Sequence, residues 1–333
     1  PILGAADDRS WALGDAEKTD KKPADKKDKK AADKSDPPSP FTALVDLENR
    51  DMKDSGDKKN GDAKTITRPR TLLEWKLFMK DGDDKEEDES QKRLPNDRPH
   101  FADDPTTVGL GRFQIESGYL YTRDRFNGVR FESHAFPDTV LRLGIFAEWF
   151  ELRLGWNYAY ERFSGPFGRV SFSGADDMMI GFRLALTEQS CWLPESALTL
   201  ELRLPTGASA FTSNEVLPSL FYHYGWDVVK DFITVEGYIA GSREVDDVGH
   251  PYLQIANAFN IEWRVTRNLT YFTEYYGTYP MSALSPNFTP QHYFHTGLSY
   301  YITNNFEVDW HIGFGLNRHS EDMFTGAGFA IRF

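Results

Sequence analysis

Charged side chains recur at alternate positions in strand-like segments of the C-terminal two-thirds of this 333-residue chain. In Glu151-Leu152-Arg153-Leu154, charge alternates with leucine, and side chains on a strand alternate between its two faces. Two kinds of chemistry are open to charges gathered on one face: ion pairs that fill an interior, and a constriction that selects permeating solutes. The predicted lumen-lining residues are Arg112, Glu116, Arg142, Glu151, Arg153, Arg183, Glu201, Arg203, Glu236, Glu262, Arg264, Glu274, Glu307, Asp309, His311 and Arg332, with His295 alongside.

The opposite face of the same segments is apolar. Leu198, Leu200, Leu202 and Leu204 are an example, and charges placed on that side in lipid would cost several kcal/mol each. We therefore expect the charged face to point inward and the apolar face to meet acyl chains. The alternative, a soluble β-sandwich, would need a second sheet to cover the apolar face.

Strand-like segments recur at the spacing of tilted membrane strands of about 9–11 residues. We predict strands over residues 111–123, 138–146, 150–162, 176–187, 196–205, 216–226, 231–241, 251–265, 269–279, 291–302, 306–316 and 323–333. The predicted fold is all-β, a 12-stranded antiparallel transmembrane β-barrel. The last strand, which ends on Phe333, is expected to close onto the first because an open edge would template aggregation.

The connections alternate in length. Residues 146–150, 227–231, 266–268 and 303–305 form short turns, with a longer one at 188–195 on the same side. The intervening loops, 124–137, 163–175, 206–215, 242–250, 280–290 and 317–322, are generally longer. Short turns on one side and long loops on the other are typical of a periplasmic and an extracellular end. Aromatic residues near both ends of the strands predict two interfacial belts.

Residues 1–96 differ from the rest. Lys, Asp, Ala and Pro dominate residues 7–64, a composition too poor in apolar surface to form a core, so we expect a largely disordered N-terminal extension. Residues 71–80 have apolar residues at helical spacing and predict a short amphipathic helix. The domains are thus a charged low-complexity periplasmic extension over 1–96 and an outer-membrane barrel over 97–333.

Several motifs together resemble a known family of outer-membrane proteins, the MetA-pathway phenol-degradation family. They are Asp97-Arg98-Pro99, Pro105-Thr106-Thr107-Val108, Gly111 to Tyr119, Arg142-Leu143-Gly144, Glu151 to Asn157, Leu202 to Gly207 and Gly313 to Asn317. The resemblance covers about residues 97–333. It implies an outer-membrane barrel that moves small, often aromatic or hydrophobic compounds, and it supplies no site residues.

Three functions follow as hypotheses. The first is a channel or transporter for a small-molecule solute. The second is a structural anchor whose residues 1–96 bind the cell wall or a periplasmic partner. The third is a lipid hydrolase, for which His319-Ser320 beside Glu321 is the candidate pair. Adjacent residues on a strand point to opposite faces, so His319 and Ser320 would not face one another as a base and a nucleophile must. We therefore predict that the protein is not an enzyme.

The remaining expectations concern ligands and partners. No nucleotide-binding motif and no metal-ligand spacing is present, so no cofactor and no metal are expected. The net charge of −13 argues against nucleic acid, and the acidic excess favours cations in the lumen. Outer-membrane lipids and the barrel-assembly machinery are the expected partners in the bacterial outer membrane.

Overall fold

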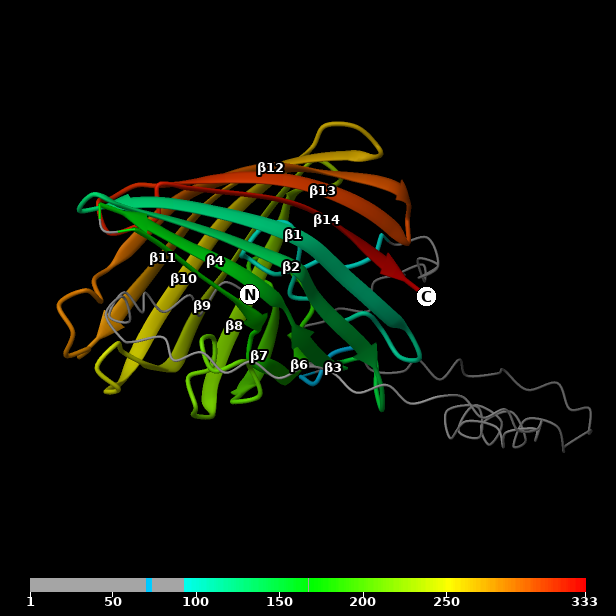
Figure 1. Ribbon diagram of the computed structural model, residues 1–333. Helices are drawn as coiled ribbons and strands as arrows, with labels where there is room; N and C mark the ends of the chain where they lie inside the picture. Colours follow the sequence, from blue (N-terminus) through cyan, green and yellow to red (C-terminus); the bar gives the residue numbers. More distant parts are fainter. Residues whose placement is uncertain (1–69, 74–92, 167) are drawn as a thin grey trace, which may run out of the picture. The chain divides into compact units, whose positions relative to one another are not determined.

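The computed structural model describes residues 70–73, 93–166 and 168–333, all of which belong to one compact unit (Figure 1). The described residues form strands and no helix. The strands are β1 (Phe113–Phe126), β2 (Val129–Gly144), β3 (Phe150–Trp156), β4 (Tyr158–Gly165), β5 (Gly168–Ala175), β6 (Met178–Thr187), β7 (Glu195–Leu204), β8 (Leu217–Val229), β9 (Ile233–Val245), β10 (Pro251–Arg264), β11 (Leu269–Met281), β12 (Gln291–Thr303), β13 (Phe306–Gly315) and β14 (Met323–Arg332).

These strands close into a ring. β1 pairs antiparallel with β14 on one side and with β2 on the other, so the sheet has no open edge there. β3 and β4 pair with successive halves of β2, so together they form one interrupted strand of the wall. β5 and β6 pair with β4 and β3 respectively, so they form the next interrupted strand. The result is the predicted 12-stranded antiparallel barrel, and the predicted closure of the last strand onto the first is confirmed.

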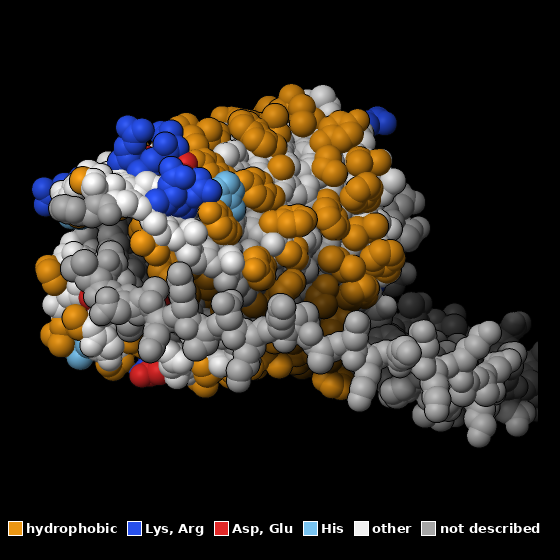
Figure 2. Space-filling model, in the orientation of Figure 1, with side chains coloured by type: hydrophobic (Ala, Val, Ile, Leu, Met, Phe, Trp, Pro, Cys, Tyr) orange, Lys and Arg blue, Asp and Glu red, His pale blue; other side chains and the backbone are white. Residues whose placement is uncertain are grey.

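Burial alternates along the strands as a barrel in lipid requires. On β14, Phe324, Ala330 and Arg332 are buried, whereas Ala327 and Phe329 are exposed. Figure 2 shows hydrophobic side chains covering the outer face of the wall. An apolar side chain that faces outward is not stabilised by burial if it stays in water. This surface therefore fits contact with lipid acyl chains.

Two of the predicted long loops are wrong. Residues 124–137 and 163–175 are mostly strand, and the first hairpin turns at Asn127 and Gly128, whose φ angles are 50° and 81°. An Asn-Gly pair adopts positive φ readily and makes the two-residue turn that matches strand twist. The strands β1, β2, β4 and β5 consequently extend beyond their neighbours β14 and β7. The loops at 205–216, 246–250, 282–290 and 316–322 remain, all on the same side.

The chain ahead of β1 runs inside the barrel. In this inner segment, residues 93–112, the N–H of Leu94 donates to the carbonyl of Asn304 at a short turn, and Ala102 and Val108 are buried. Near its end the inner segment passes against the wall at Gly144, where a Cβ would lie 1.7 Å from the carbonyl oxygen of Gly109. Glycine at 144 therefore permits a backbone contact that no other residue would.

Most of the extension lies outside the described residues, including the predicted disordered stretch over residues 7–64 and most of the predicted helix at 71–80. Thr71–Leu73 are described and are not helical: the N–H groups of Leu72 and Leu73 donate to the carbonyls of Ala185 and Leu186 on β6. Within the described part of the chain, no helix has the length and apolar character to cross a membrane.

Asp246 joins two of the long-side loops. Its carboxylate accepts N–H bonds from Val248 and His250 in its own loop and from Leu284 and Ser285 in the next. Burial opposes ionisation, but these bonds outweigh it and hold the pKa of Asp246 below its ordinary value.

We predict that Asp246→Ala raises amide hydrogen exchange at Leu284 and Ser285 by about tenfold, because each N–H loses a charged acceptor. In the wild type, the protection of these two amides is fully present above the pKa of an unfolded aspartate, about 4. It is lost as the pH falls through the lower pKa that Asp246 has in the folded protein. Hydrogen exchange across this pH range measures both effects, with Asp231→Ala, a change in a short turn at the other end of the barrel, as the control. Unchanged exchange at Ser285 would contradict the assignment.

Candidate functional site

Asp97 of the inner segment lies at the centre of three arginines from the barrel wall. Its carboxylate oxygens are 3.2 Å from Nη1 of Arg142, 2.6 Å from Nη1 of Arg153 and 2.9 Å from Nη1 of Arg183. These side chains come from β2, β3 and β6, so one carboxylate of the inner segment connects three wall strands. Asp103 adds a second contact to Arg183 at 2.6 Å.

The same arginines are also paired with carboxylates of the wall. Nε of Arg142 is 2.8 Å from Glu151, and its Nη1 is 3.0 Å from Glu116. Arg153 continues the network to Glu201 at 3.3 Å. The buried charges are therefore matched by opposite charges at short range, as the low dielectric of an interior requires. Burial alone would raise the pKa of Asp97, but the three guanidiniums hold it well below its usual range.

The other half of the wall holds the inner segment by hydrogen bonds to its backbone and side chains. Glu274 on β11 accepts the N–H of Phe101 at 3.0 Å and that of Ala102 at 2.7 Å. The carboxylate of Glu274 also contacts Nδ1 of His295 at 2.8 Å, and Nε2 of His295 contacts His311 at the same distance. Two further contacts, Arg98 to Asp309 at 3.1 Å and Asn96 to Glu307 at 2.5 Å, complete the attachment.

The charged side chains of the wall that surround the inner segment form one level of the interior, which we call the charged layer. An aromatic layer lies next to it. Inward positions alternate, so Tyr238 and Tyr276 follow Glu236 and Glu274 two residues further toward the long loops. The ring of Phe101 stacks on Tyr276 at 4.5 Å, and Tyr276 stacks on Tyr293 at 5.6 Å. The buried aromatic layer consists of Phe221, Tyr238, Tyr276, Tyr293 and Phe324, with small Ala240, Ala256 and Ala258 between them.

The structure distributes the predicted lumen residues among three places. Most are buried in the charged layer around the inner segment: Glu116, Arg142, Glu151, Arg153, Arg183, Glu236, Glu274, Glu307, Asp309 and His311 are buried, and Glu201 and Glu262 are half-buried beside them. Arg203 forms a separate pair with Glu244 further toward the long loops. Arg112, Arg264 and Arg332 lie at the short-turn end, where Arg332 donates to Asn305 and Arg264 to Asp231.

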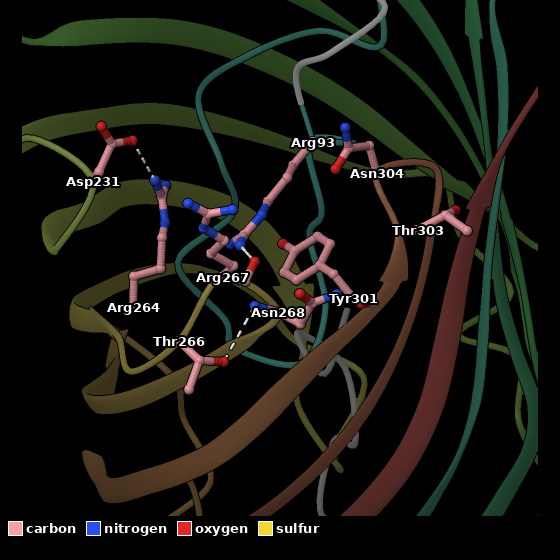
Figure 3. Close-up of a pocket in the computed structure, with 9 residues that line it drawn as sticks. All are labelled: Arg93, Asp231, Arg264, Thr266, Arg267, Asn268, Tyr301, Thr303 and Asn304. Atoms are coloured by element: carbon pink, nitrogen blue, oxygen red, sulfur yellow. Dashed lines mark hydrogen bonds and ion pairs between the residues drawn. The ribbon is translucent and has the colours of Figure 1, made fainter.

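A cleft of ≈ 710 Å³ opens at this short-turn end (Figure 3). Arg264 pairs with Asp231 at 2.7 Å on one side of the cleft, and the guanidinium of Arg93 lies 4.5 Å over the ring of Tyr301 on the other. Turn residues Thr266, Arg267, Asn268, Thr303 and Asn304 complete the lining. The cleft lies where the inner segment meets the barrel, and its guanidiniums give it a cationic character.

One group of side chains could hold a metal ion. Nε2 of His100 is 2.8 Å from Glu262 and 4.0 Å from Glu236, and one ligand atom from each lies within 4.8 Å of the others. One imidazole and two carboxylates suit a divalent transition metal. The 2.8 Å contact is equally that of an ion pair between a protonated His100 and Glu262. Spacing along the sequence does not reveal this group, since its members lie on three separate segments.

The hydrolase hypothesis finds no catalytic geometry at its candidate residues. Oγ of Ser320 donates to the carbonyl of His292 and accepts the N–H of the same residue, so it joins a loop to β12. Nε2 of His319 accepts a hydrogen bond from Arg318. Both side chains thus have structural partners, and neither orients the other as a nucleophile and base would.

A closed antiparallel barrel with an apolar exterior and a charged interior defines the class of outer-membrane β-barrels. Residues 96–333 match the family described as "Putative MetA-pathway of phenol degradation", and the chain belongs to that family. The resemblance noted in the sequence is thereby confirmed. A search of curated proteins found no match.

Several solved structures are similar to the chain, and the first of them supports the same fold. An outer membrane channel from Pseudomonas putida F1 is similar at 13% sequence identity with a TM-score of 0.54, over 69% of this chain and 98% of that one. The translocator domain of the autotransporter NalP from Neisseria meningitidis is 12% identical with a TM-score of 0.47, over 68% of this chain and 89% of that one. The NanC porin is 10% identical with a TM-score of 0.40, over 66% of this chain and 98% of that one.

Proposed function

We propose that the chain is an outer-membrane channel for small solutes, among them hydrophobic and aromatic compounds. The observation that carries this proposal is the aromatic layer beside the inner segment. At this level the lumen holds Phe101, Tyr276 and Tyr293, whose rings stack on one another in a buried layer, so a solute that passes must pack among these rings. The family description and the fold of the Pseudomonas putida channel support the same function.

The inner segment gives this channel its narrow bore. It occupies the lumen at the charged layer, where its own Asp97 binds Arg183 on one part of the wall and Glu274, on another part, accepts its backbone N–H groups. A wide diffusion pore would have an open centre at this level, whereas a filled centre restricts passage to small solutes. In the proposed orientation the short turns and residues 1–92 are periplasmic, and the long loops face the exterior.

Uptake by proteoliposomes tests the proposal. We predict that the wild type admits phenol faster than a polar solute of similar size, and that Tyr276→Ala/Tyr293→Ala lowers this preference by about three- to tenfold, since an aromatic pair contributes about 0.5–1.5 kcal/mol. Tyr222→Ala removes an exposed tyrosine of the outer face and is the matched control. A preference that survives the double substitution would contradict an aromatic route through the lumen.

The anchor hypothesis makes a different prediction in the same experiment. The anchor hypothesis holds if the barrel admits no solute and deletion of residues 1–92 releases the outer membrane from the cell wall. In that case residues 1–92, rather than the lumen, carry the function. The deletion leaves the inner segment from Arg93 onward in place, so it separates the two hypotheses.

A further inference from the structure

Five arginines lie together on the outer face of the extended strands. The register places Arg125 opposite Arg130 and Arg123 opposite Glu132 between β1 and β2. On the other side of β2, Glu132 lies opposite Arg162 on β4, and Ser164 of β4 lies opposite Arg169 on β5. These residues share one face because directly paired residues on neighbouring strands point the same way. We call Arg123, Arg125, Arg130, Arg162 and Arg169 the arginine patch.

The arginine patch adjoins the apolar wall. Outward positions of β1 read Ile115, Ser117, Tyr119, Tyr121, Arg123 and Arg125, from the short-turn end toward the hairpin tip. At about 3.3 Å per residue, Arg123 lies roughly 13 Å along the strand beyond Tyr119. Figure 2 shows a cluster of basic side chains at one end of the hydrophobic surface. Aliphatic, aromatic and then cationic residues follow one another as they would across the acyl, interfacial and headgroup levels of a leaflet.

The charges of the arginine patch are not balanced within the described residues. Glu132 is the carboxylate that it contains, 2.5 Å from Arg130 and 3.7 Å from Arg162. Arg125 and Arg169 form no ion pair with another described residue. Like charges directly opposite each other, as at Arg125 and Arg130, destabilise a strand pair unless an anion lies between them.

The hairpin tips provide room for such an anion. A cleft of ≈ 570 Å³ is lined by Arg125, Arg130 and Ser164, together with Gly128, Val129, Gly165 and Pro166 of the tips. Two guanidiniums and a hydroxyl group around one opening offer several N–H and O–H donors. Guanidinium groups bind phosphate oxygens bidentately, and phosphate carries enough charge to balance two of them.

We propose that the arginine patch binds the phosphate groups of lipid headgroups in the leaflet on the long-loop side. The inference rests on the membrane placement in the proposed function and does not depend on transport. The aromatic side chains beside the patch set the depth of the barrel, so the arginines stand at the level of the headgroups. A phospholipid or lipid A molecule offers a phosphate to the arginines and acyl chains to the adjoining apolar surface, whereas a soluble anion contacts the arginines alone.

Lipid binding to purified protein in a neutral detergent tests the proposal, with bis-phosphorylated lipid A as the probe. Native mass spectrometry should show lipid A bound to the wild type, and Arg125→Gln/Arg130→Gln/Arg169→Gln should weaken the binding at least tenfold. Binding should also weaken as the salt concentration rises. The control Lys230→Gln/Arg264→Gln/Arg267→Gln makes the same change of charge at the short-turn end and should bind as the wild type does.

Three results would overturn the proposal: equal binding by the wild type and the triple variant, equal binding of lipid A from which both phosphates have been removed, and retention of inorganic phosphate as strongly as lipid A. Should the triple variant fail to fold, Arg125→Gln and Arg169→Gln replace it, since each loses no ion pair to a described residue. Phenol uptake by the same preparations is measured separately. Loss of lipid binding with normal uptake, or the reverse, therefore distinguishes this inference from the channel function.

Discussion

Replacing Asp97 with alanine should lower the free energy of unfolding by about 3–5 kcal/mol, the cost of removing one partner from a buried ion-pair network. The change leaves Arg142, Arg153 and Arg183 facing one another without the carboxylate that lies within 3.2 Å of each of them. Urea unfolding in phospholipid vesicles, followed by tryptophan fluorescence, measures the loss.

The control for this prediction is Asp231→Ala, which removes an ion pair of the same kind at an exposed position. The side chain of Asp231 is 73% exposed, so its pair with Arg264 should contribute less than about 1 kcal/mol. Equal losses in the two variants would show that Asp97 does not hold the network together. In the wild type, the contribution of Asp97 is present above its unfolded pKa of about 4 and is lost as the pH falls through its depressed folded value.

The wall could be predicted from the sequence because its signal is periodic and local. Alternation of Leu152 and Leu154 with Glu151 and Arg153 defines two faces, and the cost of charge in lipid decides which face is inside. Strand number and closure follow from that pattern with the turn signals. The turn at Asn127-Gly128 carried a usable signal too, since this dipeptide is the strongest short hairpin indicator.

The contents of the lumen could not be predicted in the same way. Residues 93–108 have no strand or helix periodicity, and their position depends on contacts with residues far along the chain, such as Asp97 with Arg183. The one available sign was indirect: the inward face carries many buried charges, and buried arginines need partners. A carboxylate from Asp97 or Asp103 could have been sought on that ground.

The aromatic layer was missed for a different reason. Tyrosines near strand ends suggest interfacial belts, and Tyr222 does lie on the outer face. Tyr238, Tyr276 and Tyr293 share its residue type, but their positions have the inward phase. The phase of each strand, fixed by buried charges such as Glu236 and Glu274, distinguishes the two groups. Residue type alone does not.

The central claim is that the inner segment narrows the lumen and is held there by Asp97 and Glu274. Glu274 accepts two backbone N–H bonds from the inner segment, so neutral replacements at both positions should loosen it while preserving side-chain volume. We predict that Asp97→Asn/Glu274→Gln increases single-channel conductance several-fold, because two charged contacts of about 1.5–3 kcal/mol each are weakened. Single-channel recording in planar bilayers, with the wild type alongside, measures this directly. A folded double variant whose conductance equals that of the wild type would contradict the claim.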